Sequence, residues 1–91
     1  MTPPSPAGAA APAPAPSPAL TIDALGKKCP IPIIMLAERI GEVQTGQTIE
    51  VLADDPAAKT DVPAWCAMKS HEFVGLSERP EGWSFVVRRS Y

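Results

Sequence analysis

Proline is the residue that most restricts how this chain can fold, because its distribution along the sequence is uneven. Residues 1–19 contain seven of the twelve prolines and none of the eight basic and ten acidic residues. Such a segment has too little apolar surface to offset the entropy of ordering, so it predicts a disordered Pro/Ala-rich tail. Residues 20–91 are left for one small domain, which buries only roughly 60% of the surface that its unfolded chain exposes. This length excludes a large multi-site enzyme.

Charge and cysteine content exclude several classes of protein. The net charge of −2 lacks the basic surface of a protein that binds nucleic acid directly. Two cysteines and one histidine are too few for an intramolecular zinc site or a disulfide scaffold, so we expect no metal and a reduced, cytoplasmic setting. The tail lacks the basic and continuous apolar regions of a signal peptide, and no apolar run is long enough to span a membrane.

Hydrophobic periodicity predicts six elements of secondary structure, since a period of two indicates strands and a period near 3.6 indicates helices. In chain order these are a strand over 20–24, a helix over 30–42, a strand over 48–53, a helix from a cap at Thr60 or Asp61 to about His71, and a hairpin of strands over 73–77 and 83–89. The order β-α-β-α-β-β predicts an α/β (α+β) fold, a two-layer sandwich in which two helices cover one face of a four-stranded mixed sheet. The order of strands in the sheet is not readable from the sequence.

The two helices are predicted in some detail. The inner face of the first helix is expected to carry Ile33, Leu36, Ala37 and Ile40. In the second helix, Pro63 is expected within the first turn, where proline is tolerated. Cys66 shares a helical face with Val62 and Trp65 and is expected to pack as a small apolar residue, while His71 favours a helix C-terminus.

Cys29 carries the candidate chemistry. It precedes Pro30 as the predicted N-cap of the first helix, where the positive end of the helix dipole lowers the pKa of a thiol. Lys27 and Lys28 add positive charge beside it, which favours a nucleophilic sulfur. Serine is a better N-cap than cysteine, so the choice of cysteine favours function over simple capping.

The residues after Cys29 are expected to present its sulfur. Pro30 and Pro32 stiffen the first helical turn and have no N–H groups, which leaves the amides of Ile31 and Ile33 to face the sulfur. Because position 32 is not a second cysteine, the motif does not support a thioredoxin-like disulfide cycle.

Two carboxylates follow the second predicted strand. Asp54 and Asp55 are expected at the same sheet edge as Cys29, since the carboxyl ends of parallel strands lie together. Their charge opposes thiolate formation, so we interpret them as residues that dock a partner or pair with Lys27 or Lys28. A simple role in shaping the turn with Pro56 is an equally good interpretation.

The chain resembles the TusA/SirA-like family of small sulfur-carrier proteins in several successive blocks. The blocks, in order and with family-like spacing, are Leu25-Gly26-Lys27-Lys28-Cys29-Pro30-Ile31-Pro32, Gly46 before a strand, Ala53-Asp54-Asp55-Pro56, Asp61-Val62-Pro63-Ala64-Trp65-Cys66 and His71-Glu72-Phe73. They cover residues 20–91, which the resemblance identifies as a TusA-like sulfur-carrier domain, and leave the tail outside it.

The resemblance implies that Cys29 accepts sulfane sulfur as a persulfide and hands it to another protein, with no bound cofactor. It implies a cysteine desulfurase or a rhodanese-like protein as donor, and a downstream acceptor in tRNA thiolation, cofactor maturation or sulfur oxidation. Members that serve tRNA thiolation typically have an acidic residue between the two prolines. Ile31 stands there in this chain, which implies a different docking surface.

Two other classes of function stay open at this point. The first is a non-catalytic regulatory or adaptor module with the same fold, which should keep its partners when Cys29 is replaced by Ser. The second is a direct RNA-binding domain, which the acidic charge balance disfavours and which would show salt-sensitive RNA binding.

Overall fold

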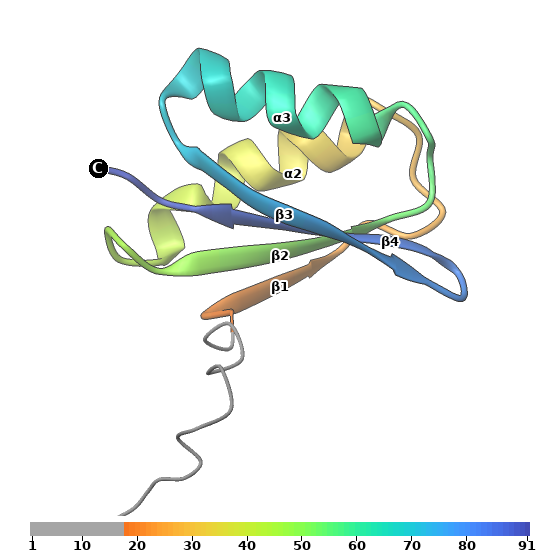
Figure 1. The fold of residues 1–91 in the computed structure, drawn as a ribbon, viewed down its shortest axis with the longest axis horizontal. Coiled ribbons are helices and arrows are strands. Elements are labelled where there is room, and N and C mark those ends of the chain that lie inside the picture. The colour runs from red at the N-terminus through yellow and green to blue at the C-terminus, as the bar shows by residue number, and fades with distance from the viewer. Residues whose placement is uncertain (1–17) are drawn as a thin grey trace, which may run out of the picture.

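Two helices cover one face of a four-stranded sheet in the computed structural model, which describes residues 18–91 (Figure 1). The elements are β1 (Leu20–Asp23), α2 (Ile31–Arg39), the 3-10 helix η1 (Ile40–Glu42), β2 (Thr48–Ala53), α3 (Ala58–Lys69), β3 (Glu72–Arg79) and β4 (Gly82–Arg88). This arrangement confirms the predicted two-layer α+β sandwich. The predicted disordered tail falls on residues 1–17, which lie outside the described residues, and on the first two residues described.

The sheet has the strand order β1-β2-β4-β3, which puts β2 and β4 at its centre. β1 runs parallel to β2, whereas β4 runs antiparallel to both of its neighbours. Because β1 and β2 are parallel, the loops that follow them leave from the same edge of the sheet, as Figure 1 shows on its right-hand side. This edge carries the candidate site.

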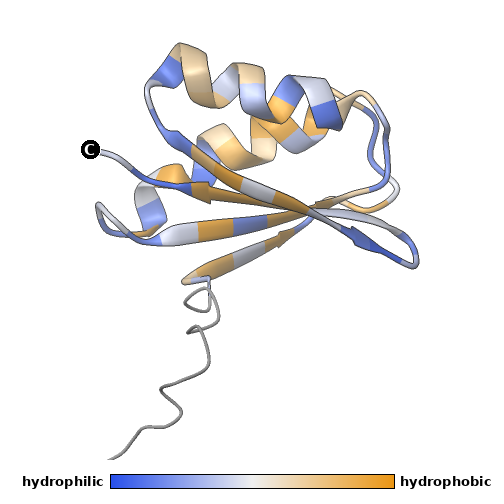
Figure 2. Cartoon of the chain, in the orientation of Figure 1, coloured by the Kyte–Doolittle hydropathy of each residue, from blue (hydrophilic) through white to orange (hydrophobic). Residues whose placement is uncertain are grey.

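The core fills the space between the two layers, and its largest fully buried side chain is Phe85 of β4. Ile22 of β1 pairs with Val51 of β2, which in turn pairs with Phe85, and all three are fully buried. Leu36 of α2 and Val62 of α3 close the core from the helical layer. Figure 2 shows the complementary pattern, with hydrophilic residues gathered at the β3–β4 turn.

The first helix differs from its prediction at both ends and on one face. The residues predicted as one helix form α2, which begins one residue later, followed by a last turn of 3-10 helix in η1. Leu36 is buried as predicted, but Ala37 is exposed and Pro32 is buried in its place. The reason is that the positions i and i+4, Pro32 and Leu36, share the helix face that meets the core.

The second helix begins at Ala58, which is earlier than the predicted cap at Thr60 or Asp61. Asp55 explains the difference, because its backbone carbonyl accepts a hydrogen bond from the Ala58 N–H at 2.9 Å and its side chain accepts one from the preceding amide, that of Ala57. The prediction that Pro63 lies in the first turn is therefore wrong, since it lies inside the helix. The helix ends at Lys69, and its C-cap residue, Ser70, adopts a left-handed conformation.

Gly82 predicts a measurable loss of stability on substitution. Its φ of +138° disfavours any side chain, and a Cβ there would lie 2.5 Å from the Ala53 carbonyl oxygen and 2.9 Å from Asp54. We expect Gly82→Ala to lower the urea midpoint of unfolding clearly, because a contact with backbone atoms cannot relax without moving the turn. Gly75→Ala is the control, since a Cβ at Gly75 meets no atom within 4 Å. Equal midpoints for the two variants would contradict the prediction.

Candidate functional site

Cys29 lies in the loop between β1 and α2, at the sheet edge described above. Its side chain is half-buried and packs against the core, whereas Cys66 on α3 is only 1% exposed. The prediction that Cys66 packs as an apolar residue is confirmed. Burial raises the pKa of the Cys66 thiol to about 11. Of the two cysteines, Cys29 is the one that is partly exposed.

Two carboxylates fix the backbone of the Cys29 loop. Asp54 Oδ2 accepts a hydrogen bond from the Gly26 N–H at 3.0 Å, and Asp55 Oδ2 accepts one from the Cys29 N–H at 2.9 Å. Asp55 Oδ1 also binds the Ala57 N–H at 3.0 Å, so this side chain joins the Cys29 loop to the start of α3. The prediction that these carboxylates share an edge with Cys29 is confirmed. They dock the chain's own backbone and also shape the turn.

The predicted pairing of Asp54 or Asp55 with a lysine is not found as a direct ion pair among residues 18–91. Lys27 and Lys28 are exposed. The two backbone hydrogen bonds hold the pKa of the Asp55 carboxyl below its ordinary value, and the charge of Lys28 adds to this effect through space. Lys28 therefore lowers the pKa of the Asp55 carboxyl through its charge, without a direct ion pair.

The predicted fall in the pKa of the Cys29 thiol is wrong for the free protein, in which this pKa is raised. Burial is the main cause, and Asp61 adds to it by a hydrogen bond that holds the protonated thiol and by charge repulsion of the thiolate; the charge of Asp55 acts in the same direction. The helix also begins after Pro30, one residue beyond the predicted cap. Its first amide, that of Ile31, donates to the Lys28 carbonyl at 2.8 Å and is not free for the sulfur.

Asp61 lies beside the site, although the sequence predicts it only as a candidate helix cap and as part of one family-like block. Starting α3 at Ala58 instead places Asp61 at the head of a helical face with Ala64, Trp65 and Met68, at spacings of three, four and seven residues. That spacing is visible in the sequence. The packing of this face against the start of α2 is not, since it depends on the tertiary fold.

A groove of about 250 Å³ runs between α2 and α3 beside the Cys29 loop, and we call it the α2–α3 groove. It is lined by Pro30, Ile33, Asp61, Ala64, Trp65 and Met68. Asp61 is the one charged side chain in this lining. Ile31 and Ile34 extend the apolar surface on α2, with 42% and 45% of their areas exposed. Of the predicted docking residues, Pro30 and Ile31 are exposed here, while Pro32 is buried and supports the turn from below.

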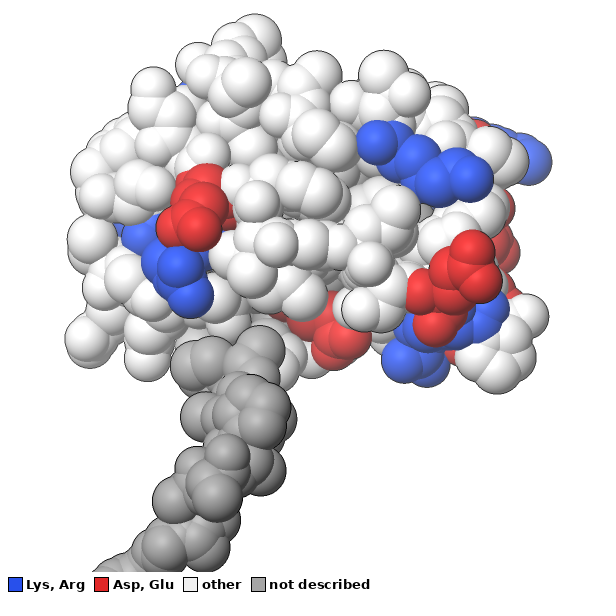
Figure 3. Space-filling view, viewed as in Figure 1, with Lys and Arg blue, Asp and Glu red and all other residues white. Residues whose placement is uncertain are grey.

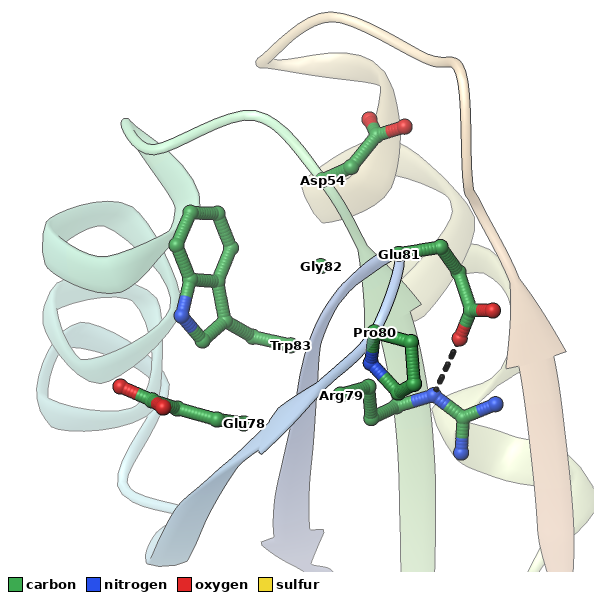
Figure 4. Close-up of a pocket in the computed structure, with 7 residues that line it drawn as sticks. All are labelled: Asp54, Glu78, Arg79, Pro80, Glu81, Gly82 and Trp83. Carbon is green, nitrogen blue, oxygen red and sulfur yellow. Dashed lines mark hydrogen bonds and ion pairs between the residues drawn. The ribbon is translucent and has the colours of Figure 1, made fainter.

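A larger hollow of about 470 Å³ lies at the β3–β4 turn and contains none of the cysteines (Figure 4). Arg79 and Glu81 form an ion pair at 3.0 Å on its rim, and the Trp83 indole lies beside it with the Lys59 ammonium 4.4 Å from the ring centre. Asp54 is the only residue that this hollow shares with the Cys29 edge. We therefore do not assign the chemistry to it.

His71 stands at the opposite end of α3 from Asp61. Its ring stacks between those of Trp65 and Tyr91, at centroid distances of 5.6 and 4.6 Å, and its Nδ1 accepts a hydrogen bond from the Ser90 N–H. Burial and the charge of Arg89 lower the pKa of His71. His71 lies just beyond the end of α3, as the sequence predicts, but its lowered pKa gives no net stabilisation of the charged imidazole there.

Stability should consequently fall as the pH drops through the titration of His71. At a pH above the pKa of His71 in the unfolded chain, the imidazole is neutral in both states and does not affect stability. As the pH falls through that pKa and then through the lower pKa of the folded state, the unfolded chain binds the proton more readily, so the free energy of unfolding decreases. Urea midpoints at about pH 7.5 and about pH 5.5 measure this loss. Because the chain has one histidine, His71→Gln should flatten the dependence, and an unchanged slope would contradict the assignment.

Groups of three or more potential metal ligands do not occur within residues 18–91. In the same part of the chain, the helices are all too short or too polar to cross a membrane. On the face seen in Figure 3, charged side chains lie in small separate groups, some of mixed sign and some of one sign, and most of the described surface is neutral.

Comparisons of this chain with protein-family models and with solved structures each find a match. A family model described as "Sulfurtransferase TusA" matches residues 20–89. Among solved structures, the crystal structure of a SirA-like protein from Desulfitobacterium hafniense superposes with a TM-score of 0.69 at 24% sequence identity, covering 79% of this chain and 99% of that one. The structural likeness shows the shared fold.

Proposed function

Because this chain belongs to the TusA sulfurtransferase family, we propose that it is a sulfur carrier that accepts sulfane sulfur as a persulfide on Cys29. The observation that carries the proposal is the difference between its two thiols. Cys29 is half-exposed in a loop held at both Gly26 and Cys29 by carboxylates of the neighbouring loop, while Cys66 is buried. A fixed, accessible thiol suits a group that another protein must reach.

The transfer is an exchange of one S–S bond for another. The Cys29 thiolate attacks the terminal sulfur of a persulfide on the donor protein, the new S–S bond forms, and the donor's own S–S bond breaks. The donor cysteine leaves as a thiolate, and Cys29 keeps the transferred sulfur. In the second transfer a thiolate of the acceptor protein attacks the terminal sulfur on Cys29, and Cys29 leaves as the thiolate. Neither transfer therefore needs an external oxidant or reductant.

The partners proposed for this chain are a cysteine desulfurase or a rhodanese-like protein as donor and a downstream sulfur-acceptor protein. The exposed residues around Cys29 are the proposed docking surface, namely Lys27, Lys28, Pro30 and Ile31. Pro32, Asp54 and Asp55 are proposed to support it from the side of the protein.

Intact mass spectrometry tests the proposal and identifies the class of donor. The protein is incubated with cysteine and a cysteine desulfurase, and separately with thiosulfate and a rhodanese. We expect one-sulfur mass increments with at least one system, and their removal by dithiothreitol, which reduces a persulfide. The absence of increments with both systems would overturn the proposal.

Residues 20–91 are the proposed carrier domain, with residues 1–19 as a spacer that has no charged side chain and no side chain larger than that of Met. A chain that lacks residues 1–19 and begins at Leu20 should therefore keep the urea midpoint of the full chain and accept sulfur at the same rate. The comparison measures both properties side by side. A clear fall in the midpoint of the truncated chain would contradict the proposed boundary.

A further inference from the structure

Ser90 and Tyr91 fold back over the end of α3, and we call these two residues the C-terminal strap. Figure 1 shows the C end of the chain beside the connection from α3 to β3. The strap leaves β4 through Arg89, whose carbonyl accepts a hydrogen bond from the Gly46 N–H at 2.7 Å and whose N–H donates to Gln47 at 2.9 Å. Because Arg89 is held in this way, the strap has a fixed base and its movement leaves the sheet intact.

A few directional contacts hold the strap against the protein. The Ser90 N–H donates to Nδ1 of His71 at 3.1 Å, and the Tyr91 ring stacks on the His71 ring at a centroid distance of 4.6 Å. The Tyr91 hydroxyl donates to the Lys69 carbonyl at 2.8 Å. Little surface is buried by these contacts, since 62% of Tyr91 stays exposed. The attachment of the strap therefore depends strongly on His71.

The strap forms part of the wall of a hollow of about 250 Å³ at this end of the protein. The lining of this hollow includes Tyr91, His71 and Trp65. The His71 ring stacks on that of Trp65 at a centroid distance of 5.6 Å. Trp65 also lines the α2–α3 groove, so a stack of rings connects the strap with that groove.

We propose that the C-terminal strap is a pH-sensitive switch, which is closed when the His71 imidazole is neutral and is released when the imidazole is protonated. In the closed state Nδ1 of His71 is the acceptor for the Ser90 N–H, so the proton of the neutral ring is on Nε2. Protonation by solvent places a second hydrogen on Nδ1, and two donors then face each other. The hydrogen bond is lost, and the Ser90 N–H turns to water as the strap leaves.

The charged groups around His71 favour its neutral form in the closed state. Lys69 from α3 and Arg89 from the end of β4 line the same hollow, whose lining contains no carboxylate side chain. The helix α2 and the turn η1 contribute only apolar side chains to it. Glu72, the next residue in the chain, is engaged in an ion pair within the sheet, and the main-chain oxygen of Tyr91 is bound by Arg89 Nε at 2.7 Å.

Ring stacking acts in the opposite direction, because a protonated imidazole between two aromatic rings gains a cation–π attraction. This attraction is of the same order as one neutral hydrogen bond. The lost hydrogen bond to Ser90 and the repulsion by Arg89 together outweigh it. Burial and the charge of Arg89 hold the pKa of His71 below its ordinary value, which agrees with this balance.

An NMR titration of His71 tests the coupling, since a strap that protonation releases must itself oppose protonation. The chain has one histidine, so its imidazole C–H signals report this titration alone. Tyr91→Ala removes the ring and the hydroxyl that hold the strap, and should raise the titration midpoint of His71 by roughly half a pH unit. An unchanged or lower midpoint overturns the proposal, because loss of the cation–π attraction alone would lower it.

Backbone mobility measures the release directly. The heteronuclear NOE of the Tyr91 amide should fall toward that of a mobile chain end between about pH 7.5 and about pH 5.5. The NOE of Phe85 in β4 should stay constant and so verify that the protein is folded at both pH values. A constant NOE at Tyr91 overturns the release.

Two variants separate the role of His71 from that of the other charges. His71→Phe keeps an aromatic ring but has no nitrogen acceptor, so the NOE of Tyr91 should lose its pH dependence. Lys69→Gln is the control, because it removes a charge from the hollow and keeps the carbonyl that binds the Tyr91 hydroxyl; its pH dependence should remain. A pH dependence that persists in His71→Phe overturns the role of His71.

Discussion

Replacing Cys29 with Ser is expected to abolish every one-sulfur mass increment, whereas Cys66→Ala should load as much sulfur as the unchanged chain. The reason is access combined with ionisation. Cys66 is 1% exposed and its burial raises its pKa to about 11. At neutral pH such a thiol is ionised to only about one part in ten thousand. Cys29 has a raised pKa as well, but the residue is partly exposed.

Intact mass of the two variants after incubation with each donor system measures this difference. Tryptic mapping of the loaded protein, performed without reductant, places the sulfur on the peptide that contains Cys29. Increments that persist in Cys29→Ser would assign the sulfur to Cys66 and contradict the site. A Cys29→Ser protein that keeps its partners and its cellular role would instead support the adaptor interpretation.

The second large effect is expected in the core. Phe85→Ala should lower the free energy of unfolding by about 3–5 kcal/mol, because it removes the largest fully buried side chain and leaves a cavity between the layers. A domain of about 70 residues is stabilised by only roughly 4–11 kcal/mol, so this loss is a large part of the total stability. Urea titration monitored by circular dichroism measures the loss.

Phe73→Ala provides the matched control for Phe85→Ala. Phe73 is also a phenylalanine of the sheet, but it lies half-buried on the edge strand β3. Its removal opens a site that water can fill, so the loss should be clearly smaller. Similar losses for the two variants would show that the centre of the core is not at β4.

The fold could be predicted from the sequence where the signal is local. In β2, the alternation of Ile49, Val51 and Ala53 with less buried neighbours is the pattern of a half-buried strand, and the structure buries those three residues. The position of Asp54 and Asp55 beside Cys29 also followed from a local rule, the shared edge of parallel strands.

The errors concern residues whose role depends on contacts distant in the sequence. The pKa of Cys29 was predicted from its own loop and helix, but it is set by burial and by Asp61, which is 32 positions later in the chain. The start of α3 differs from its prediction because Thr60 and Asp61 are preferred N-cap residue types, whereas the helix begins earlier, where Asp55 binds the Ala57 amide. Strand order likewise depends on packing and has no local signature.

The ends of the described chain leave the fold from the edge remote from Cys29. The Ala19 N–H binds the Thr48 carbonyl at the start of β2, and the Arg89 N–H binds the carbonyl of Gln47, one residue earlier. The Cys29 loop lies beyond the other end of β2, on the opposite side of Figure 1. A fluorophore, an affinity handle or a fused protein attached at Tyr91 would therefore leave the edge that carries Cys29 unobstructed. The molecule is thus suited to immobilisation, with its thiol facing outward, in measurements of sulfur delivery on a surface.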